Sequence, residues 1–166
     1  MLEVVSQSPA ETLAVGKALA RVLQDGDVVL LHGDLGAGKT TLAKGIASAL
    51  GVSEVVSSPS FSLVNEYDTG LASTTSRLYH LDLYRLRDEA DLASIGFDDL
   101  MAAADGVMLV EWPERAAAAL PDRFLLIEIE PVGPESRRLR FVAGADDEIW
   151  MSRIERLDSH LAARPD

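Results

Sequence analysis

One segment of the chain has the residue types and spacing of a phosphate-binding loop. Gly33, Gly38, Lys39 and Thr40 occupy the constrained positions of the pattern G-x-x-x-x-G-K-[ST]. Glycines let a backbone wrap an anion with its N–H groups turned inward, in conformations that a β-carbon would obstruct. We therefore predict that this loop holds the phosphates of a nucleotide through Gly33, Asp34, Leu35, Gly36, Ala37, Gly38, Lys39, Thr40 and Thr41.

The residues at the end of the loop have distinct expected tasks. The helix that follows directs its N-terminal dipole and free amides at the same anion. Lys39 is expected to reach the β and γ phosphates, and the Thr40 hydroxyl to ligate Mg²⁺. The sequence thus predicts a site for a magnesium nucleoside triphosphate.

Such a site needs a further acidic group at the end of a neighbouring strand, and two residues compete for that place. Asp82 follows the segment 78–81, and Glu111 follows the more apolar segment 107–110. Either carboxylate could hold the metal, directly or through water, and either could instead be a solvated group at a strand end. The pattern alone does not choose between them.

Three other features lie near these residues in the sequence. The hydroxyl-rich segment 57–60 is either a switch that senses the γ phosphate or a plain turn. Trp112, directly after Glu111, either lies beside the nucleotide or packs at the strand end. Arg85 and Arg87 could act as arginine fingers, but we favour solvated or ion-paired side chains for both.

The elements around the loop predict an α/β fold. The apolar run 28–31 is typical of a strand buried on both faces, and it leads directly into the loop. A helix is expected over 41–50, and an earlier helix begins at a capping box formed by Ser8 and Glu11. We predict a P-loop NTPase with a mixed parallel and antiparallel sheet flanked by helices, as a single domain over residues 1–166.

The remaining expected elements are read from alternation and turn residues. They are a hairpin of 61–67 with 77–83, helical structure over 88–101 broken at Gly96, a strand at 107–110, a hairpin of 124–130 with 137–142, and a closing helix over 146–163.

Composition narrows the class of protein. The chain has 166 residues, no cysteine and a formal net charge of −12. Without cysteine there is no disulfide, thiolate metal site or cysteine nucleophile. The acidic charge disfavours independent binding of nucleic acid, so any link to RNA is expected to pass through a partner protein. No apolar run is long enough to cross a bilayer, so we expect a cytoplasmic protein with no membrane contact.

Four segments together resemble the TsaE family, formerly called YjeE. They are G-D-L-G-A-G-K-T-T at 33–41, S-P-S-F-S-L-V-N-E-Y at 58–67, H-L-D-L-Y-R-L at 80–86 and L-V-E-W-P-E at 109–114. The resemblance implies a weak ATPase that uses ATP and Mg²⁺ and supports the bacterial machinery making threonylcarbamoyladenosine in tRNA. It implies TsaD and TsaB proteins as partners, with tRNA contacted only through the complex.

The resemblance also implies roles for individual residues. It makes Lys39, Asp82 and Glu111 the catalytic residues, with Thr40 and both acids at the metal, and it places Trp112 near the nucleotide. The family's switch segment usually has threonine where this chain has Ser60. The hydroxyl is kept, so Ser60 is still expected at the metal, whereas the lost methyl loosens its rotamer.

Two other classes of P-loop protein are weighed against this reading. A small metabolite kinase has similar length and elements, but it needs an acceptor pocket and commonly an arginine-bearing lid, and the segment 116–122 is mostly alanine. A GTPase would typically carry an N-K-x-D motif, and no such string occurs, so ATP is the expected nucleotide.

Overall fold

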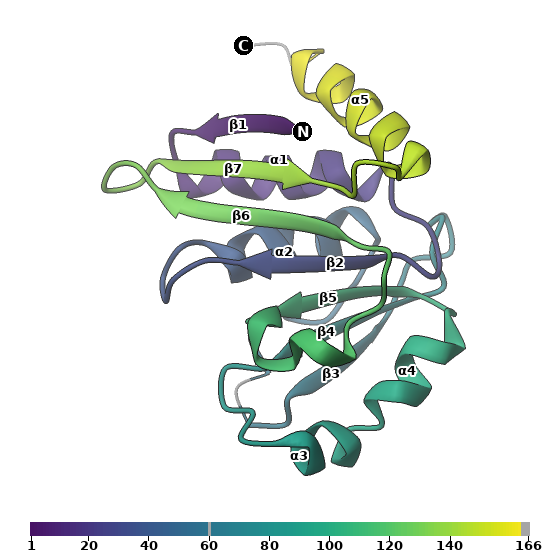
Figure 1. Ribbon diagram of the computed structural model, residues 1–166. Helices are drawn as coiled ribbons and strands as arrows, with labels where there is room; N and C mark the ends of the chain where they lie inside the picture. Colours follow the sequence, from purple (N-terminus) through teal and green to yellow (C-terminus); the bar gives the residue numbers. More distant parts are fainter. Residues whose placement is uncertain (60, 164–166) are drawn as a thin grey trace.

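The structure is a computed structural model that describes residues 1–59 and 61–163. A seven-stranded sheet in the order β1-β7-β6-β2-β5-β4-β3 runs through it (Figure 1). The strands are β1 (Leu2–Ser6), β2 (Val28–His32), β3 (Val64–Asp68), β4 (Arg77–Asp82), β5 (Val107–Glu111), β6 (Leu125–Pro131) and β7 (Arg137–Val142). The helices are α1 (Pro9–Ala20), α2 (Lys39–Ala49), α3 (Glu89–Ser94), α4 (Phe97–Ala103), the 3₁₀ segment η1 (Pro113–Ala119) and α5 (Glu148–Ala162).

The four central strands, β6, β2, β5 and β4, are parallel to one another, and β3, β7 and β1 each pair antiparallel with a neighbour. Register aligns Leu31 of β2 with Glu111 of β5, and Glu111 with Asp82 of β4. Because parallel strands end at the same edge of a sheet, the carboxyl ends of these three strands meet beside the loop that follows β2. This edge is where ligands bind in open α/β sheets.

Helices α1 and α2 pack on one face of the sheet in the larger apolar cluster, and α5 joins it beside β1. The approach of α1 to α2 is close because glycines face the partner helix. A β-carbon at Gly45 would lie 2.1 Å from the carbonyl oxygen of Leu13, and one at Gly16 would lie 2.4 Å from that of Leu42. Helix α1 therefore supports the helix that begins at the phosphate-binding loop.

The opposite face of the sheet is covered by α3, α4 and η1 through a second apolar cluster that contains Leu92, Phe97 and Ala116. Figure 1 shows η1, in green, in front of the lower strands, and α3 and α4 on the side of the molecule that carries β3. The two clusters share β2 and β5 between them, because alternate residues of these strands point to opposite faces. Both strands are therefore buried on both sides, as the apolar run of residues 28–31 predicts.

Most of the predicted elements are confirmed with small shifts of their ends. Both hairpins, the central strands, the helix after the loop and the break at Gly96 are present. Ser8 caps α1 by accepting from Glu11 N, while Glu11 Oε2 accepts from Gln7 N at 2.7 Å, one residue earlier than a capping box requires. The residues 61–63 form a turn before β3 instead of extending it. Two elements were not predicted, β1 and η1.

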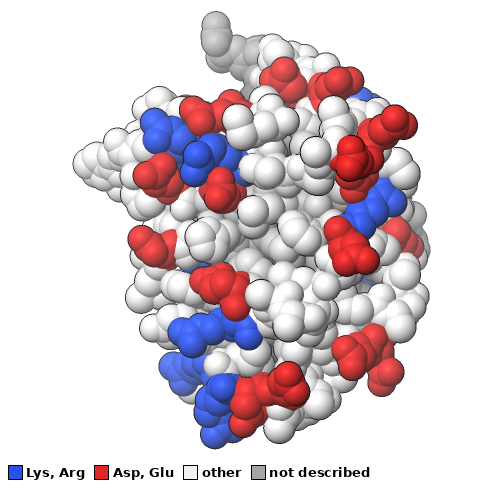
Figure 2. All heavy atoms as spheres, in the orientation of Figure 1, with Lys and Arg blue, Asp and Glu red and all other residues white. Residues whose placement is uncertain are grey.

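The surface carries charges of both signs. On the face seen in Figure 2, lysine and arginine side chains gather at the upper left and the lower left, and acidic side chains lie beside both groups. Arg138 pairs with Glu3 and Glu130, and Arg140 with Glu128. Within residues 1–59 and 61–163, no helix has the length and apolar character needed to span a membrane.

Candidate functional site

The loop between β2 and α2 contains backbone amides that have no hydrogen-bond partner among the described residues. Gly36 and Gly38 have φ angles of 78° and 111°, the left-handed conformations that glycine adopts without strain. Within the described part of the chain, no acceptor bonds the N–H groups of Gly36, Gly38, Lys39, Thr40 and Thr41. The last three are first-turn amides of α2, which have no partner within a helix. The loop thus has the donors of an anion cradle.

Lys39 is held within the loop. Its Nζ donates to the carbonyl oxygens of Gly33 at 2.5 Å and Asp34 at 2.8 Å, and the residue is only 5 % exposed. Burial lowers the pKa of Lys39 from its ordinary value of 10.5, and the nearby carboxylates of Glu111 and Asp82 oppose that shift. The ammonium group is therefore poorly solvated and close to negative charge, and an anion in the loop can take over these hydrogen bonds.

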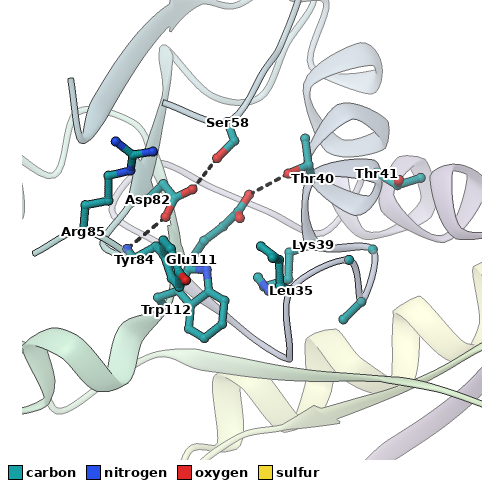
Figure 3. A pocket seen from close by; sticks show the side chains of 13 residues that line it. Leu35, Lys39, Thr40, Thr41, Ser58, Asp82, Tyr84, Arg85, Glu111 and Trp112 are labelled. Atoms are coloured by element: carbon teal, nitrogen blue, oxygen red, sulfur yellow. Dashed lines mark hydrogen bonds between the residues drawn. The ribbon is translucent and has the colours of Figure 1, made fainter. Parts of the chain in front are cut away.

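Asp82 and Glu111 lie side by side at the carboxyl ends of β4 and β5, next to the loop (Figure 3). Both are largely buried, at 8 % and 3 % exposure. Glu111 Oε1 accepts a hydrogen bond from Thr40 Oγ1 at 3.3 Å. The two acids between which the sequence could not choose thus belong to one site, together with Thr40.

The oxygen atoms gathered here are of the kind that Mg²⁺ prefers. Mg²⁺ is usually held by one or two carboxylates and a hydroxyl, with phosphate oxygens and water completing its shell. Thr40, Glu111 and Asp82 supply a hydroxyl and two carboxylates beside the free amides. The residues present therefore fit the metal.

Asp82 is also tied to the segment expected to act as a switch. Ser58 Oγ donates a hydrogen bond to Asp82 Oδ2, and the Tyr84 amide donates to Asp82 Oδ1 at 3.0 Å. Within the described residues of the segment 57–60, the serine that contacts an acid of the site is thus Ser58. Ser60, the predicted metal ligand, lies outside the described residues.

His80 was not singled out by the sequence analysis, yet it contacts the site. Its Nε2 lies 2.8 Å from Glu111 Oε1, and its side chain is fully buried. The signal was present in the spacing, because residues two apart on a strand share a face and His80 precedes Asp82 by two. The histidine therefore stands beneath the two carboxylates, on the core side of the site.

Trp112 lies over Lys39. The Lys39 Nζ is 4.3 Å from the centroid of the indole ring, within the range of a cation–π contact. The ring centroids of Tyr84 and Trp112 are 4.9 Å apart. Trp112 has a φ of 58°, a conformation that costs a non-glycine residue about 1–2 kcal/mol. Trp112 therefore lines the cleft beside the loop, and its contact with a nucleotide stays a prediction.

The two arginines considered as fingers differ in surroundings. Arg87 makes an exposed ion pair with Asp91, which agrees with the favoured reading. Arg85 lines the cleft, and its Cζ lies 4.8 Å from the centroid of the Phe61 ring. Another arginine, Arg137, was missed entirely, and it donates to the carbonyl oxygen of Ala37 within the loop.

These groups surround a cleft of about 520 Å³ that is large enough for a nucleotide's phosphates and part of its nucleoside. Gly33 and Asp34 do not line the cleft, and they join it only through the hydrogen bonds that their carbonyl oxygens accept from Lys39. Leu35, which lines the cleft, is 79 % exposed. The cleft is lined by Leu35, Gly36, Ala37, Gly38, Lys39, Thr40, Thr41, Ser58, Asp82, Tyr84, Arg85, Glu111 and Trp112.

The chain is similar to proteins of one named family. Residues 6–139 match the model of a family described as "Threonylcarbamoyl adenosine biosynthesis protein TsaE". A Bacillus subtilis protein named as a tRNA threonylcarbamoyladenosine biosynthesis protein TsaE is 39% identical over 92% of each chain. A Treponema pallidum protein of the same name is 37% identical over 81% of this chain and 96% of its own.

A solved structure agrees with these relatives. The crystal structure of YdiB from Bacillus subtilis matches with a TM-score of 0.78 and 35% sequence identity, over 96% of this chain and 95% of that one. The fold is that of a P-loop NTPase with a mixed sheet. Because the family model spans most of the chain and the relatives share its length, the protein belongs to the TsaE family.

Proposed function

We propose that the protein binds and hydrolyses ATP with Mg²⁺, as a subunit of the bacterial machinery that makes threonylcarbamoyladenosine in tRNA. The observation that carries the chemistry is the row of Thr40, Glu111 and Asp82 beside a loop with free amides. The biological setting is supported by relatives that are named for threonylcarbamoyladenosine biosynthesis and share most of the chain.

Binding begins with an exchange of partners at Lys39. The free amides and the helix end receive the β phosphate, and Lys39 Nζ leaves the carbonyl oxygens of Gly33 and Asp34 to donate to the β and γ phosphates. Since Nζ also lies over the Trp112 ring, this movement removes the cation–π contact between them. Nucleotide binding thus rearranges groups that already touch.

Hydrolysis requires a water in line with the bond between the γ phosphorus and the β–γ bridging oxygen. Thr40 with Asp82 or Glu111 would hold Mg²⁺, which would supply positive charge to offset that of the phosphates. The other carboxylate accepts a hydrogen bond from the attacking water. The new bond joins the water oxygen to phosphorus, the bridging bond breaks, and the proton that the water loses passes to phosphate or to that carboxylate and then to solvent as ADP and phosphate leave.

In this proposal the hydrolysis of ATP takes place in a complex with partner proteins. We propose TsaD and TsaB proteins as partners, with weak hydrolysis by the isolated subunit and faster hydrolysis in the complex. The formal charge of −12 agrees with tRNA being contacted by the complex rather than by this chain. ATP turnover then supports repeated cycles of the transferase, in the cytoplasm where tRNA is modified.

The test is ATP hydrolysis by the purified protein, alone and with TsaD plus TsaB proteins, together with the yield of modified tRNA over several turnovers. We expect stimulated hydrolysis and an ATP-dependent increase in yield. A Lys39→Ala variant serves as the control for contaminating ATPases. Equal hydrolysis with and without the partners, and no effect on yield, would remove the protein from this role.

The kinase alternative gives a different result in the same experiment. A metabolite kinase releases ADP only when an acceptor is present, needs no partner protein and yields a phosphorylated product. Release of inorganic phosphate without a phosphorylated product therefore separates the two classes.

A further inference from the structure

We infer that Arg137 positions the phosphate-binding loop, holding its peptide groups so that the amides stay turned toward the cleft before any nucleotide arrives. Arg137 is the first residue of β7 and lies 100 positions after Ala37 in the sequence. The inference rests on the proposed nucleotide binding and adds to it a residue that touches no phosphate.

The guanidinium of Arg137 joins the loop to the turn between β6 and β7. Nε donates to the carbonyl oxygen of Ala37 at 2.8 Å, and Nη2 lies 3.5 Å from that of Gly36. On the other side, Nη1 donates to the carbonyl oxygens of Ser136 at 2.9 Å and Gly133 at 3.3 Å. A planar, rigid group with five donors suits this bridge better than a single ammonium group would.

The contact with Ala37 fixes one of the amides of the anion cradle. A peptide unit is planar, with its carbonyl oxygen and N–H pointing in opposite directions. The carbonyl of Ala37 and the N–H of Gly38 belong to the same unit, and this N–H has no partner among the described residues. Holding the oxygen against Arg137 therefore aims the Gly38 N–H away from β7 and into the cleft.

This unit needs an external hold because Gly38 has little intrinsic preference. Gly38 sits at a φ of 111°, and glycine reaches other φ values at little cost, so the peptide plane can rotate. The neighbouring unit is fixed differently, because the Ala37 N–H bonds to the Asp34 carbonyl oxygen at 3.0 Å. Arg137 supplies the constraint that the turn itself lacks.

The strand pattern explains why Arg137 reaches the loop and its neighbours do not. Side chains two apart on a strand share a face, so Arg137 lies on the face of Leu139 and Phe141, which pack in the cluster of α1 and α2. Arg138 and Arg140 point to the opposite face, where they pair with glutamates. Arg140 therefore offers a matched control of the same residue type on the same strand.

A direct role at the phosphates is the competing reading. Arg137 does not line the cleft, and its contacts in the structure are with backbone carbonyl oxygens. A residue that binds the γ phosphate discriminates ATP from ADP, whereas a residue that shapes the loop affects both nucleotides equally. The two readings are therefore separable by affinity.

The experiment compares the wild type with Arg137→Gln, Arg137→Lys and Arg140→Gln. Calorimetry with Mg²⁺ measures the affinity for ADP and for a nonhydrolysable ATP analogue, and thermal unfolding confirms that each variant is folded. We expect Arg137→Gln to weaken both nucleotides by the same factor, about tenfold for one lost charge-assisted hydrogen bond. Arg137→Lys should lose less, and Arg140→Gln should bind like the wild type.

Hydrogen exchange of the segment 33–41 without nucleotide gives a second readout. Faster exchange in Arg137→Gln than in Arg140→Gln is expected, because the loop loses its hold. Unchanged affinity and unchanged exchange, or a loss confined to the ATP analogue, would overturn the inference. The exchange measurement tests the role of Arg137 without any nucleotide. If the wild type failed to bind nucleotide, that result would overturn the proposed function and not the inference about Arg137.

Discussion

His80 Nε2 lies 2.8 Å from Glu111 Oε1, the same oxygen that accepts from the Thr40 hydroxyl. An ionised carboxylate only accepts, so Nε2 is the donor to Oε1, while the buried Nδ1 has no partner among the described residues. Both donors hold Oε1, and Oε2 has no donor within the described part of the chain. The histidine thus orients Glu111 toward the loop.

We expect His80→Leu to lower the ATPase rate while leaving the affinity for ADP without Mg²⁺ unchanged. The variant removes the hydrogen bond that His80 donates to the buried carboxylate of Glu111. Losing such a bond costs about 1–3 kcal/mol, so the carboxylate is held less firmly in place. Steady-state hydrolysis and calorimetry check this. His80→Gln places an N–H near the position of Nε2 and should recover part of the rate; no difference between the two variants would count against an orienting role.

Lys39→Ala should weaken nucleotide binding by roughly 10- to 100-fold, because a charge-assisted hydrogen bond to phosphate contributes about 1.5–3 kcal/mol. Isothermal titration calorimetry with Mg²⁺ and ADP measures the change. Lys44, exposed on the same helix, provides the control variant Lys44→Ala. Equal affinities of the two variants would show that the ammonium of Lys39 does not hold phosphate.

Asp82→Asn and Glu111→Gln should each reduce turnover by about 10²-fold or more while the protein stays folded, since each replaces a charged oxygen ligand with a neutral amide. The variant whose carboxylate binds the metal directly should also need more Mg²⁺ for half-maximal nucleotide affinity. Titration of Mg²⁺ at fixed nucleotide measures this. Glu66→Gln, at an exposed position of β3, is the control.

The fluorescence of Trp112 should change when nucleotide binds. The ring contacts the Lys39 ammonium at 4.3 Å, and the proposed shift of Lys39 toward phosphate removes that contact. The other tryptophan, Trp150, is 1 % exposed and packs with α1 and the sheet, away from the cleft. A Trp112→Phe variant should therefore lose the signal, and a signal that persists in it would assign the change to Trp150.

Gly45→Ala should lower the free energy of unfolding by about 1–3 kcal/mol, the range of overpacked sites. The added β-carbon would meet backbone atoms of Leu13 at 2.1 Å and 2.9 Å, so α1 and α2 must move apart. Urea denaturation followed by circular dichroism measures the loss. In Gly144→Ala the added β-carbon would meet only Asp147, at 3.9 Å. This control should change the free energy of unfolding by only a few tenths of the loss expected for Gly45→Ala.

Local patterns predicted the parts of the site that lie close together in the sequence. The apolar run 28–31, the glycine pattern and the helix after it define strand, loop and helix without reference to the rest of the chain. Asp82 and Glu111 were found as candidates because each ends a strand. The two residues are neighbours only because β4 pairs with β5, and this pairing cannot be predicted from a local sequence pattern.

Other parts of the structure escaped because their partners are far away in the sequence. The segment 2–6 alternates weakly and becomes a strand only by pairing with β7. Arg137 is one of three arginines on β7, and only the packing of the loop distinguishes it. His80 gives a signal through its spacing from Asp82, but that spacing has meaning only once the segment is known to be a strand.

The pairing of β1 with β7 makes the first few residues a remote determinant of the nucleotide site. Ser6 lies opposite Arg137, so β1 covers the edge of the strand from which Arg137 reaches the loop. Trimming these residues, or fusing a bulky purification handle that prevents them from pairing, would leave β7 as an open edge. The position of an affinity tag is thus an experimental variable in any measurement of ATP binding by this protein.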